Sequence, residues 1–363
     1  MGSFFWSILG FLALFSLILH SFYVYSQFGV KDIPNERSLH ETPTKKSGGM
    51  IFIPIFIIAC LCYTTLLPTN LTNPLLPNPG DFFSSPTEIN FLYIVLAGTC
   101  LMMFLGFFDD IYQLSPKLRL FVELAVLFSF VFLASPNIKL FEWEFGNHWY
   151  LKLAFVFFLV FAINLVNFMD GMDFYVVGTF WITSLGIPIL FKDSFQISGF
   201  LFFTIVLLYG SLFGFVFYNL PKARLFMGDS GSLALGFLIC CFPFFPFPTS
   251  ESKDLDLSRY FYLFPYFWID GIWTIVKRLI QGKDIFQAHR EHLFQRLTES
   301  RFGKLGTLVL FLILNLIVVI ISSIMNHFQC SDFFVFLVSF IFVLFSYFFF
   351  WSFVPRKNLA RSP

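Results

Sequence analysis

Long apolar segments separated by short polar loops divide this sequence, and few folds can accept that pattern. A helix needs about 20 apolar residues to cross the roughly 30 Å hydrocarbon layer of a bilayer. The chain is 57% hydrophobic and only 12% charged, which excludes a soluble globular fold. We predict an all-α, polytopic integral membrane protein, a single transmembrane domain over 1–363, with about eleven transmembrane helices. Their segments are 3–25, 48–68, 90–107, 118–134, 149–168, 174–191, 197–218, 231–247, 259–279, 306–325 and 332–354.

The basic residues are divided unevenly between the two sides that alternating crossings define. Lys and Arg concentrate in cytoplasmic loops of membrane proteins. One side carries 18 of the 23 Lys and Arg residues. We therefore predict that this side is cytoplasmic, with the N-terminus outside and the C-terminus inside. Its segments are 31–49, 108–119, 166–174, 219–230, 277–305 and the C-terminal tail.

The polar motifs of the chain all fall on this predicted cytoplasmic side, although carboxylates and imidazoles are costly near hydrocarbon. In FFDDIYQLSPK, Asp109 and Asp110 are adjacent. Two neighbouring carboxylates repel unless a cation or proton lies between them, so the pair suits magnesium binding or a general base. Lys117 suits a phosphate as a point charge. An ordinary solvated loop is the alternative.

A second motif, NLVNFMDGMDF, spaces oxygen-bearing side chains by three residues. Asn164, Asn167, Asp170 and Asp173 follow an i, i+3 series that keeps them near one face of a helix end. Hard oxygen ligands suit magnesium, which often keeps waters and substrate phosphates as its other ligands. Helix capping is the alternative, because Asn, Asp and Gly all favour helix ends.

The third motif, MGDSGSLALGF, places Asp229 between Gly228 and Gly231, directly before an apolar segment. Glycines permit close backbone approach, and a helix start offers N–H groups to a phosphate. A carboxylate here is best used to bind a metal that bridges a pyrophosphate. The alternative, an esterase nucleophile elbow, does not fit because no strand precedes the motif.

The fourth motif, AHREHLFQRL, spaces His289, His292 and Arg296 as one polar stripe of a helix, with Arg290 beside it. Imidazole and guanidinium groups on one face suit a diphosphate or a leaving nucleotide. The alternative is a basic amphipathic helix on anionic lipid headgroups. A zinc site is not indicated, because the motif has no third ligand.

Three further positions are less decisive. The first inward loop combines Arg37, His40, Lys45 and Lys46 with a glycine pair, which suits phosphate binding or simply inward orientation. Asp270 lies inside an apolar segment, where it either joins the site or pairs within the bundle. Glu123 is expected to pair with Arg119 one helical turn before it.

Together, DDIYQLSPK, NLVNFMDGMD, FMGDSGSLALG and HREHLFQRL resemble, in order, the polyprenyl-phosphate N-acetylhexosamine-1-phosphate transferases (glycosyltransferase 4 type). The resemblance covers about residues 31 to 300. It implies an enzyme of the bacterial inner membrane that transfers a sugar-1-phosphate from a UDP-sugar to undecaprenyl phosphate. UMP is released, and Mg²⁺ is required, with Mn²⁺ as a substitute.

The resemblance also implies roles for individual residues. Asp229 and Asn167 are similar to the metal ligands, and Asp109 to the residue that positions or deprotonates the lipid phosphate, with support from Asp110. Lys117 resembles the phosphate-binding lysine. The remaining residues of the implied substrate-binding set are Lys46, Asn164, Asp170, Asp173, His289, Arg290, His292 and Arg296.

The sequence departs from the family pattern at three places, and the last of them bears on the sugar substrate. Phe174 stands where many relatives have glycine, Lys46 stands in the position of an arginine, and HREH replaces a triple histidine. The last difference favours the enzymes that initiate O-antigen, in lipopolysaccharide, or related surface glycans. The donor is then UDP-GlcNAc or a 6-deoxy-HexNAc relative.

Two alternatives stay open. One is the phospho-N-acetylmuramoyl-pentapeptide transferase of peptidoglycan synthesis. The other is a lipid-linked sugar transporter, from which we expect internal repeats and polar residues on both faces. The expected partners are the UDP-sugar, the lipid carrier and the bilayer, with a homodimer as a candidate assembly and no nucleic acid.

Overall fold

The computed structural model describes residues 2–34, 42–66, 86–190, 199–248, 250, 253–284 and 289–354. Every predicted apolar segment coincides with a helix or with two consecutive helices. The helices are α1 (Gly2–Tyr25), α2 (Gly49–Leu66), α4 (Pro86–Tyr112), α5 (Pro116–Ala134), α6 (Trp149–Met169), α7 (Tyr175–Leu190), α8 (Gly199–Asn219), α9 (Asp229–Cys240), α10 (Arg259–Leu263), α11 (Pro265–Ile280), α12 (Leu293–Thr298), α13 (Gly303–His327) and α14 (Asp332–Trp351).

Six helices in the described part of the chain are long and apolar enough to cross a membrane, namely α1, α4, α6, α8, α13 and α14. Their outer faces carry large apolar side chains such as Trp6, Phe22 and Phe345, which are 67%, 65% and 70% exposed. Water would not tolerate so much exposed apolar surface, whereas hydrocarbon does. The protein is therefore embedded in a membrane. Eleven crossings and the orientation of the termini stay predictions.

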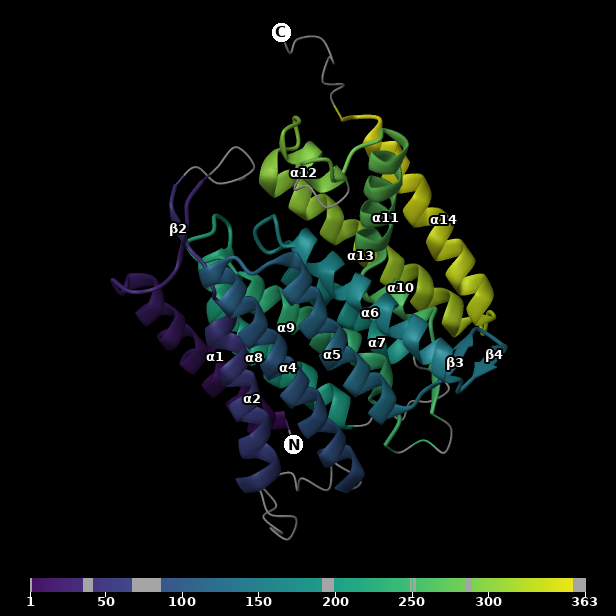
Figure 1. Cartoon of the computed structure of the whole chain (residues 1–363), viewed down its shortest axis with the longest axis horizontal. Helices are drawn as coiled ribbons and strands as arrows, with labels where there is room; N and C mark the ends of the chain where they lie inside the picture. The colour runs from purple at the N-terminus through teal and green to yellow at the C-terminus, as the bar shows by residue number, and fades with distance from the viewer. Residues whose placement is uncertain are drawn as a thin grey trace.

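Helix α9 lies in the interior of the helical assembly, where it packs against α4, α6 and α2 (Figure 1). Its residues from Ser230 to Cys240 are all buried. The predicted segment 231–247 continues beyond α9 into a short 3₁₀ helix, Phe242–Phe244, that contains Pro243. Proline lacks the N–H that an α-helix needs, so α9 stops before it. Apolarity here reflects burial among other helices rather than contact with lipid.

The predicted segment 259–279 is divided into α10 and α11. Phe264 separates them with φ −150° and ψ 65°, and Pro265 begins α11. A residue before proline avoids the helical region, which explains the break. The division sets the direction of α11, which extends toward the end of the molecule that carries α12.

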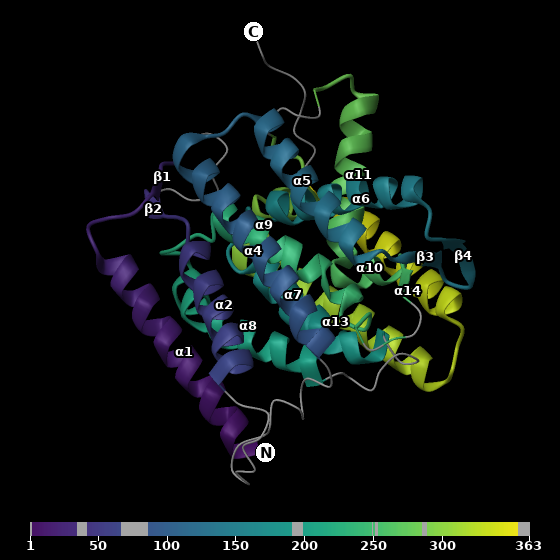
Figure 2. The ribbon, with the colours of Figure 1, turned by 60° about the horizontal axis from the view of Figure 1, so that its bottom comes forward.

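Two small sheets add to the predicted all-α fold. Strands β1 (Lys31–Asp32) and β2 (Thr44–Lys45) pair antiparallel. Strand β3 (Asn137–Leu140) pairs antiparallel with β4 (Trp143–Gly146) and parallel with β5 (Asp254–Asp256). The three-stranded sheet lies beyond the end of α5 and the start of α6, at the side of the helical assembly (Figure 2). Such short strands have too few residues for a clear alternation of apolar and polar side chains.

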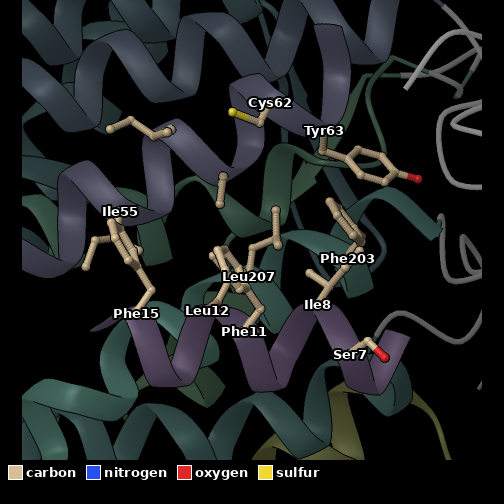
Figure 3. A pocket seen from close by; sticks show the side chains of 12 residues that line it. Ser7, Ile8, Phe11, Leu12, Phe15, Ile55, Cys62, Tyr63, Phe203 and Leu207 are labelled. Atoms are coloured by element: carbon tan, nitrogen blue, oxygen red, sulfur yellow. The ribbon is translucent and has the colours of Figure 1, made fainter. Parts of the chain in front are cut away.

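A recess of about 460 Å³ opens between α1, α2 and α8 (Figure 3). Phe11, Ile55, Ile58 and Leu207 are among its lining side chains, which are almost all apolar. Its α2 residues begin at Ile55, more than one helical turn beyond the start of that helix at Gly49. Without charged side chains the recess offers nothing to bind a phosphate, so the candidate site lies elsewhere.

Candidate active site at the start of helix α9

Asp110 joins three parts of the chain at the start of α9. Its carboxylate accepts hydrogen bonds from the backbone N–H of Asp229 at 3.2 Å and of Ser230 at 3.4 Å. Ser47 Oγ donates to it at 2.8 Å, and Lys46 Nζ lies 3.3 Å away. Side-chain capping of this kind satisfies the first N–H groups of a helix. The expectation that these N–H groups are available to a phosphate is therefore wrong for the first two.

Backbones approach closely at this junction, and two glycines make the approach possible. A Cβ atom on Gly106 of α4 would lie 2.1 Å from the carbonyl oxygen of Asp229. Gly228 has φ +72°, and its Cβ would lie 2.5 Å from Asp110 Oδ2. Only glycine fits both a contact of that length and a left-handed backbone. The loop 45–49 also bonds to 225–228, for example through the N–H of Gly49 to the carbonyl oxygen of Met227 at 3.0 Å.

Asp229, the first residue of α9, turns its carboxylate toward the end of α6. Asn167 Nδ2 donates to Asp229 Oδ1 at 2.6 Å and to Ser232 Oγ at 2.8 Å. The Asp229 side chain keeps 35% of its surface exposed, whereas that of Asp110 keeps 2%. Asp229 is therefore the carboxylate of this pair that can reach a ligand.

Arg119 of α5 is a site residue that the sequence analysis missed. Its guanidinium lies 3.0 Å from Asp109 Oδ2 and 3.9 Å from Asp229 Oδ2. It also donates to Asn164 Oδ1 at 2.7 Å. Its predicted contact with Glu123 is confirmed at 3.3 Å. The local pair was visible as a one-turn spacing, but the other contacts join residues distant in the sequence.

The neighbouring Asp109 and Asp110 do not form a two-carboxylate site. They occupy successive positions on α4, where side chains point about 100° apart. Asp109 turns to Arg119 and to the backbone N–H of Leu114 at 2.8 Å, whereas Asp110 turns to Lys46 and α9. Each carboxylate has its own cation, so no shared ion is needed between them.

Burial and mutual repulsion raise the pKa values of two carboxylates near the start of α9. Burial, followed by the charge of Asp110, raises the pKa of Asp229 to about 7. Burial and the charges of Asp229, Asp110 and Asp173 also raise the pKa of Asp170, which caps the end of α6. Acids whose ionised forms repel in this way are stabilised by an added cation.

The donor set fits a magnesium ion better than a metal held only by protein. Among the described residues, no three His, Cys, Asp or Glu side chains lie close enough together to hold a metal. Mg²⁺ commonly uses one or two carboxylates and completes its shell with waters and substrate phosphates. Asp229 beside the amide of Asn167 is a donor set of that kind.

The fourth motif does not form the helical stripe expected of it. Helix α12 begins only at Leu293, and His292 before it has φ −63° and ψ 146°. The rings of His289 and His292 nevertheless lie together, with centroids 5.1 Å apart. Arg296 lies on the helix and over the Trp351 ring at 5.6 Å, and Arg290 pairs with Glu299 at 3.7 Å.

His289 should be a neutral imidazole near pH 7. Burial, then the charges of His292 and Arg278, lowers its pKa to about 4. We expect a midpoint of about 4 in a histidine-selective NMR titration of the protein in detergent, with His289→Gln used to assign the resonance. Because the folded state disfavours the protonated form of His289, the contribution of His289 to the stability of the ligand-free fold is lost as the pH falls from about 6.5, its ordinary pKa, to about 4. A midpoint near 6.5 would show that the imidazole is not desolvated.

Helix α12 brings the fourth motif against the second. Phe294 and Gln295 lie beside Gly171, where an added Cβ would be 3.4 Å and 3.7 Å from them. Gly171 stands between Asp170 and Asp173 in the turn after α6. Phe174 in the same turn has φ +62°, a left-handed backbone conformation that glycine adopts most easily. The chain therefore keeps at Phe174 a backbone conformation that a glycine would favour.

Several predicted residues lie outside these contacts. Lys117 is exposed on the first turn of α5. Asp173 accepts a hydrogen bond from the backbone N–H of Ala223 at 3.1 Å. Lys45 bonds to the end of α1 through the carbonyl oxygen of Ser26 at 2.7 Å. The roles of Lys117 and Asp173 stay predictions, and Arg37 and His40 lie outside the described residues.

Comparison with known proteins finds sequence similarity to sugar-phosphate transferases. Residues 92–245 match the model of glycosyl transferase family 4. A probable undecaprenyl-phosphate N-acetylglucosaminyl 1-phosphate transferase of Bacillus subtilis is 26% identical over 79% of this chain and 75% of its own length. A decaprenyl-phosphate N-acetylglucosaminephosphotransferase of Mycobacterium tuberculosis is 24% identical over 76% and 70%, respectively.

A phospho-N-acetylmuramoyl-pentapeptide-transferase of Listeria welshimeri is 28% identical over 59% of this chain and 65% of its own length. The matched family region contains α4, α6 and α9, which supply Asp109, Asn167 and Asp229. Over the region that carries these residues, the chain is therefore similar to the polyprenyl-phosphate N-acetylhexosamine-1-phosphate transferases.

Proposed function

We propose that this protein transfers a HexNAc-1-phosphate from a UDP-sugar to undecaprenyl phosphate, releasing UMP. The observation that carries the proposal is the meeting of Asp109, Asn167, Asp229 and Arg119 at one end of the helices. Acids and a guanidinium at the start of one helix suit a pyrophosphate and its counterion. The Bacillus and Mycobacterium relatives are named for transfer of N-acetylglucosamine phosphate to a polyprenyl phosphate.

The reaction is an in-line displacement at phosphorus. An oxygen of the lipid phosphate forms a bond to the sugar-bearing phosphorus, and the bond from that phosphorus to the bridging oxygen breaks. UMP leaves with the electron pair, and the product is a lipid-linked pyrophosphoryl sugar. Bound Mg²⁺ supplies positive charge to the pyrophosphate, and Mn²⁺ is expected to substitute.

The chain's own residues hold the reactants. Asp229 and Asn167 would hold the metal when it is bound, and Asp110 fixes the start of α9 on which Asp229 stands. Arg119 orients Asp109 and Asn164 and adds positive charge. The lipid phosphate is largely ionised near neutral pH, so Asp109 need only orient it.

We place the reaction on the cytoplasmic face of the bacterial inner membrane and assign it to the start of a surface glycan such as O-antigen. The excess of Lys and Arg in the loops that carry the site supports that side. The HREH sequence supports UDP-GlcNAc or a 6-deoxy-HexNAc relative as the donor. The muramoyl-pentapeptide donor is the second candidate, favoured by the likeness to the Listeria enzyme.

A donor panel tests the proposal directly. Purified protein in detergent is given undecaprenyl phosphate, Mg²⁺ and one of several UDP-sugars, including UDP-GlcNAc, 6-deoxy-HexNAc donors and UDP-N-acetylmuramoyl-pentapeptide. We expect UMP release with UDP-GlcNAc or a 6-deoxy donor, loss of it with EDTA, and recovery with added Mg²⁺. Release only with the pentapeptide donor selects the second candidate. No release with any donor contradicts the assignment.

A further inference from the structure

Asp270 is a fully buried carboxylate that lies apart from the carboxylates near the start of α9. It lies in the middle of α11, with no surface exposed to solvent. Its Oδ1 accepts hydrogen bonds from Tyr347 of α14 at 2.9 Å and from the backbone N–H of Leu293 at 2.8 Å. Thr274, one turn further along α11, donates at 3.4 Å. An isolated charge is costly at such a depth, so partners from three helices indicate a specific task.

The carboxylate faces the imidazole of His292. The distance from His292 Nδ1 to Asp270 Oδ1 is 3.6 Å, and 6% of the surface of His292 is exposed. Neither His292 Nδ1 nor Asp270 Oδ2 has a hydrogen-bond partner among the described residues. A carboxylate beside Nδ1 favours the tautomer that carries its proton on Nδ1. Nε2 is then left without a proton and can accept a hydrogen bond from an O–H or N–H group of a ligand.

The loop before α12 is attached to α11 at a second point. Glu291 contacts Arg278 at 2.8 Å and Lys283 at 2.9 Å. Asp270 therefore holds His292 and the first N–H of α12, while the end of α11 holds the residue before it. The residues on both sides of His292 are therefore held in place. The His292 ring itself lies beside Asp270 and packs against the rings of His289 and Phe294.

We propose that Asp270 is a positioning residue, which sets the tautomer and orientation of His292 so that His292 Nε2 accepts a hydrogen bond from a hydroxyl or amide N–H group of the sugar donor. The inference rests on the proposed function, because it assigns His292 to the donor. Tyr347 supports it by holding Asp270 from α14, so that this helix contributes to the site without touching a substrate.

A double-mutant cycle on donor kcat/KM is the test. Asp270→Asn keeps the size and one acceptor oxygen but removes the charge that faces His292. We expect it to raise the donor KM about tenfold, with the undecaprenyl phosphate KM unchanged. Combined with His292→Gln, it should change donor kcat/KM by less than about twofold further. Equal losses in both backgrounds would overturn the positioning role.

A second pair of variants serves if Asp270→Asn does not fold. Tyr347→Phe removes one donor to Asp270, and Tyr266→Phe is its matched control, because Tyr266 joins the same two helices through Ser346 at 2.6 Å. We expect a higher donor KM only for Tyr347→Phe, and only when His292 is present. Equal effects of the two substitutions contradict the proposal.

A spectroscopic measurement separates this inference from the proposed function. In ¹⁵N NMR of histidine-labelled protein, His292 should carry its proton on Nδ1, and Asp270→Asn should move the population toward Nε2. If the wild type releases no UMP with any donor, the proposed function fails and this tautomer shift still tests the contact. If the wild type is active and the tautomer does not shift, the inference alone fails.

Discussion

Asp229→Asn should lower UMP release by at least about a thousandfold while the protein stays folded in detergent. Asp229 is the accessible carboxylate at the start of α9, and asparagine cannot supply its charge to the metal or pyrophosphate. The variant should stay folded, because partial burial and the charge of Asp110 already raise the pKa of Asp229 to about 7. The folded protein therefore disfavours the ionised form of Asp229, which asparagine cannot adopt. The melting temperature without metal should be unchanged or higher.

The matched control is Asp254→Asn. Asp254 lies in β5 and accepts a hydrogen bond from Asn137 at 3.3 Å, at the other end of α5 and α6. We expect this variant to keep full activity under the same assay. Full activity of Asp229→Asn would remove the metal role from that residue, and unfolding of it would assign Asp229 to structure instead.

Asp110→Ala, unlike Asp229→Asn, should lower the stability of the fold strongly. The substitution leaves two helix N–H groups, the Ser47 hydroxyl and the Lys46 ammonium without their shared acceptor. Removing one partner of a buried, hydrogen-bonded ion pair costs about 3–5 kcal/mol. Thermal unfolding in detergent measures the change.

Asp110→Asn is the graded control, because its amide oxygen still accepts from the start of α9. We expect an intermediate melting temperature for Asp110→Asn and the lowest for Asp110→Ala. If both variants melt like the wild type and lose only activity, Asp110 acts on a substrate and the capping role is wrong.

The helices were largely predictable because membrane helices satisfy their own backbone groups and therefore appear in the sequence as long apolar segments. Buried helices give the same apolar pattern, so the pattern did not show that α9 lies in the interior of the assembly rather than against lipid. The break at Phe264, by contrast, could have been predicted, because Pro265 follows this residue in the sequence. The short strand β3 had no comparable pattern.

The residues of the site were predictable in type but less so in partnership. Asp109, Asn167 and Asp229 were identified from their motifs, and their gathering at one end followed from the alternation of crossings. Arg119 was assigned only to its one-turn neighbour, because its contacts with Asp109 and Asp229 depend on how α4, α5 and α9 pack. The role of Asp110 as a helix cap required the same packing.

Close contacts at Gly49, Gly106 and Gly231 limit which side chains this protein can carry beside the start of α9. A Cβ atom on any of them would lie 2.1 to 2.2 Å from a neighbouring atom, so none of the three positions can take a larger side chain unless its neighbour moves. If the proposed pyrophosphate lies against these glycines, a variant of altered donor preference is expected to carry its changes elsewhere, for example at Phe294 and Gln295 beside the turn after α6. The sugar specificity of the proposed reaction would then change without any change in the groups proposed to bind the phosphates.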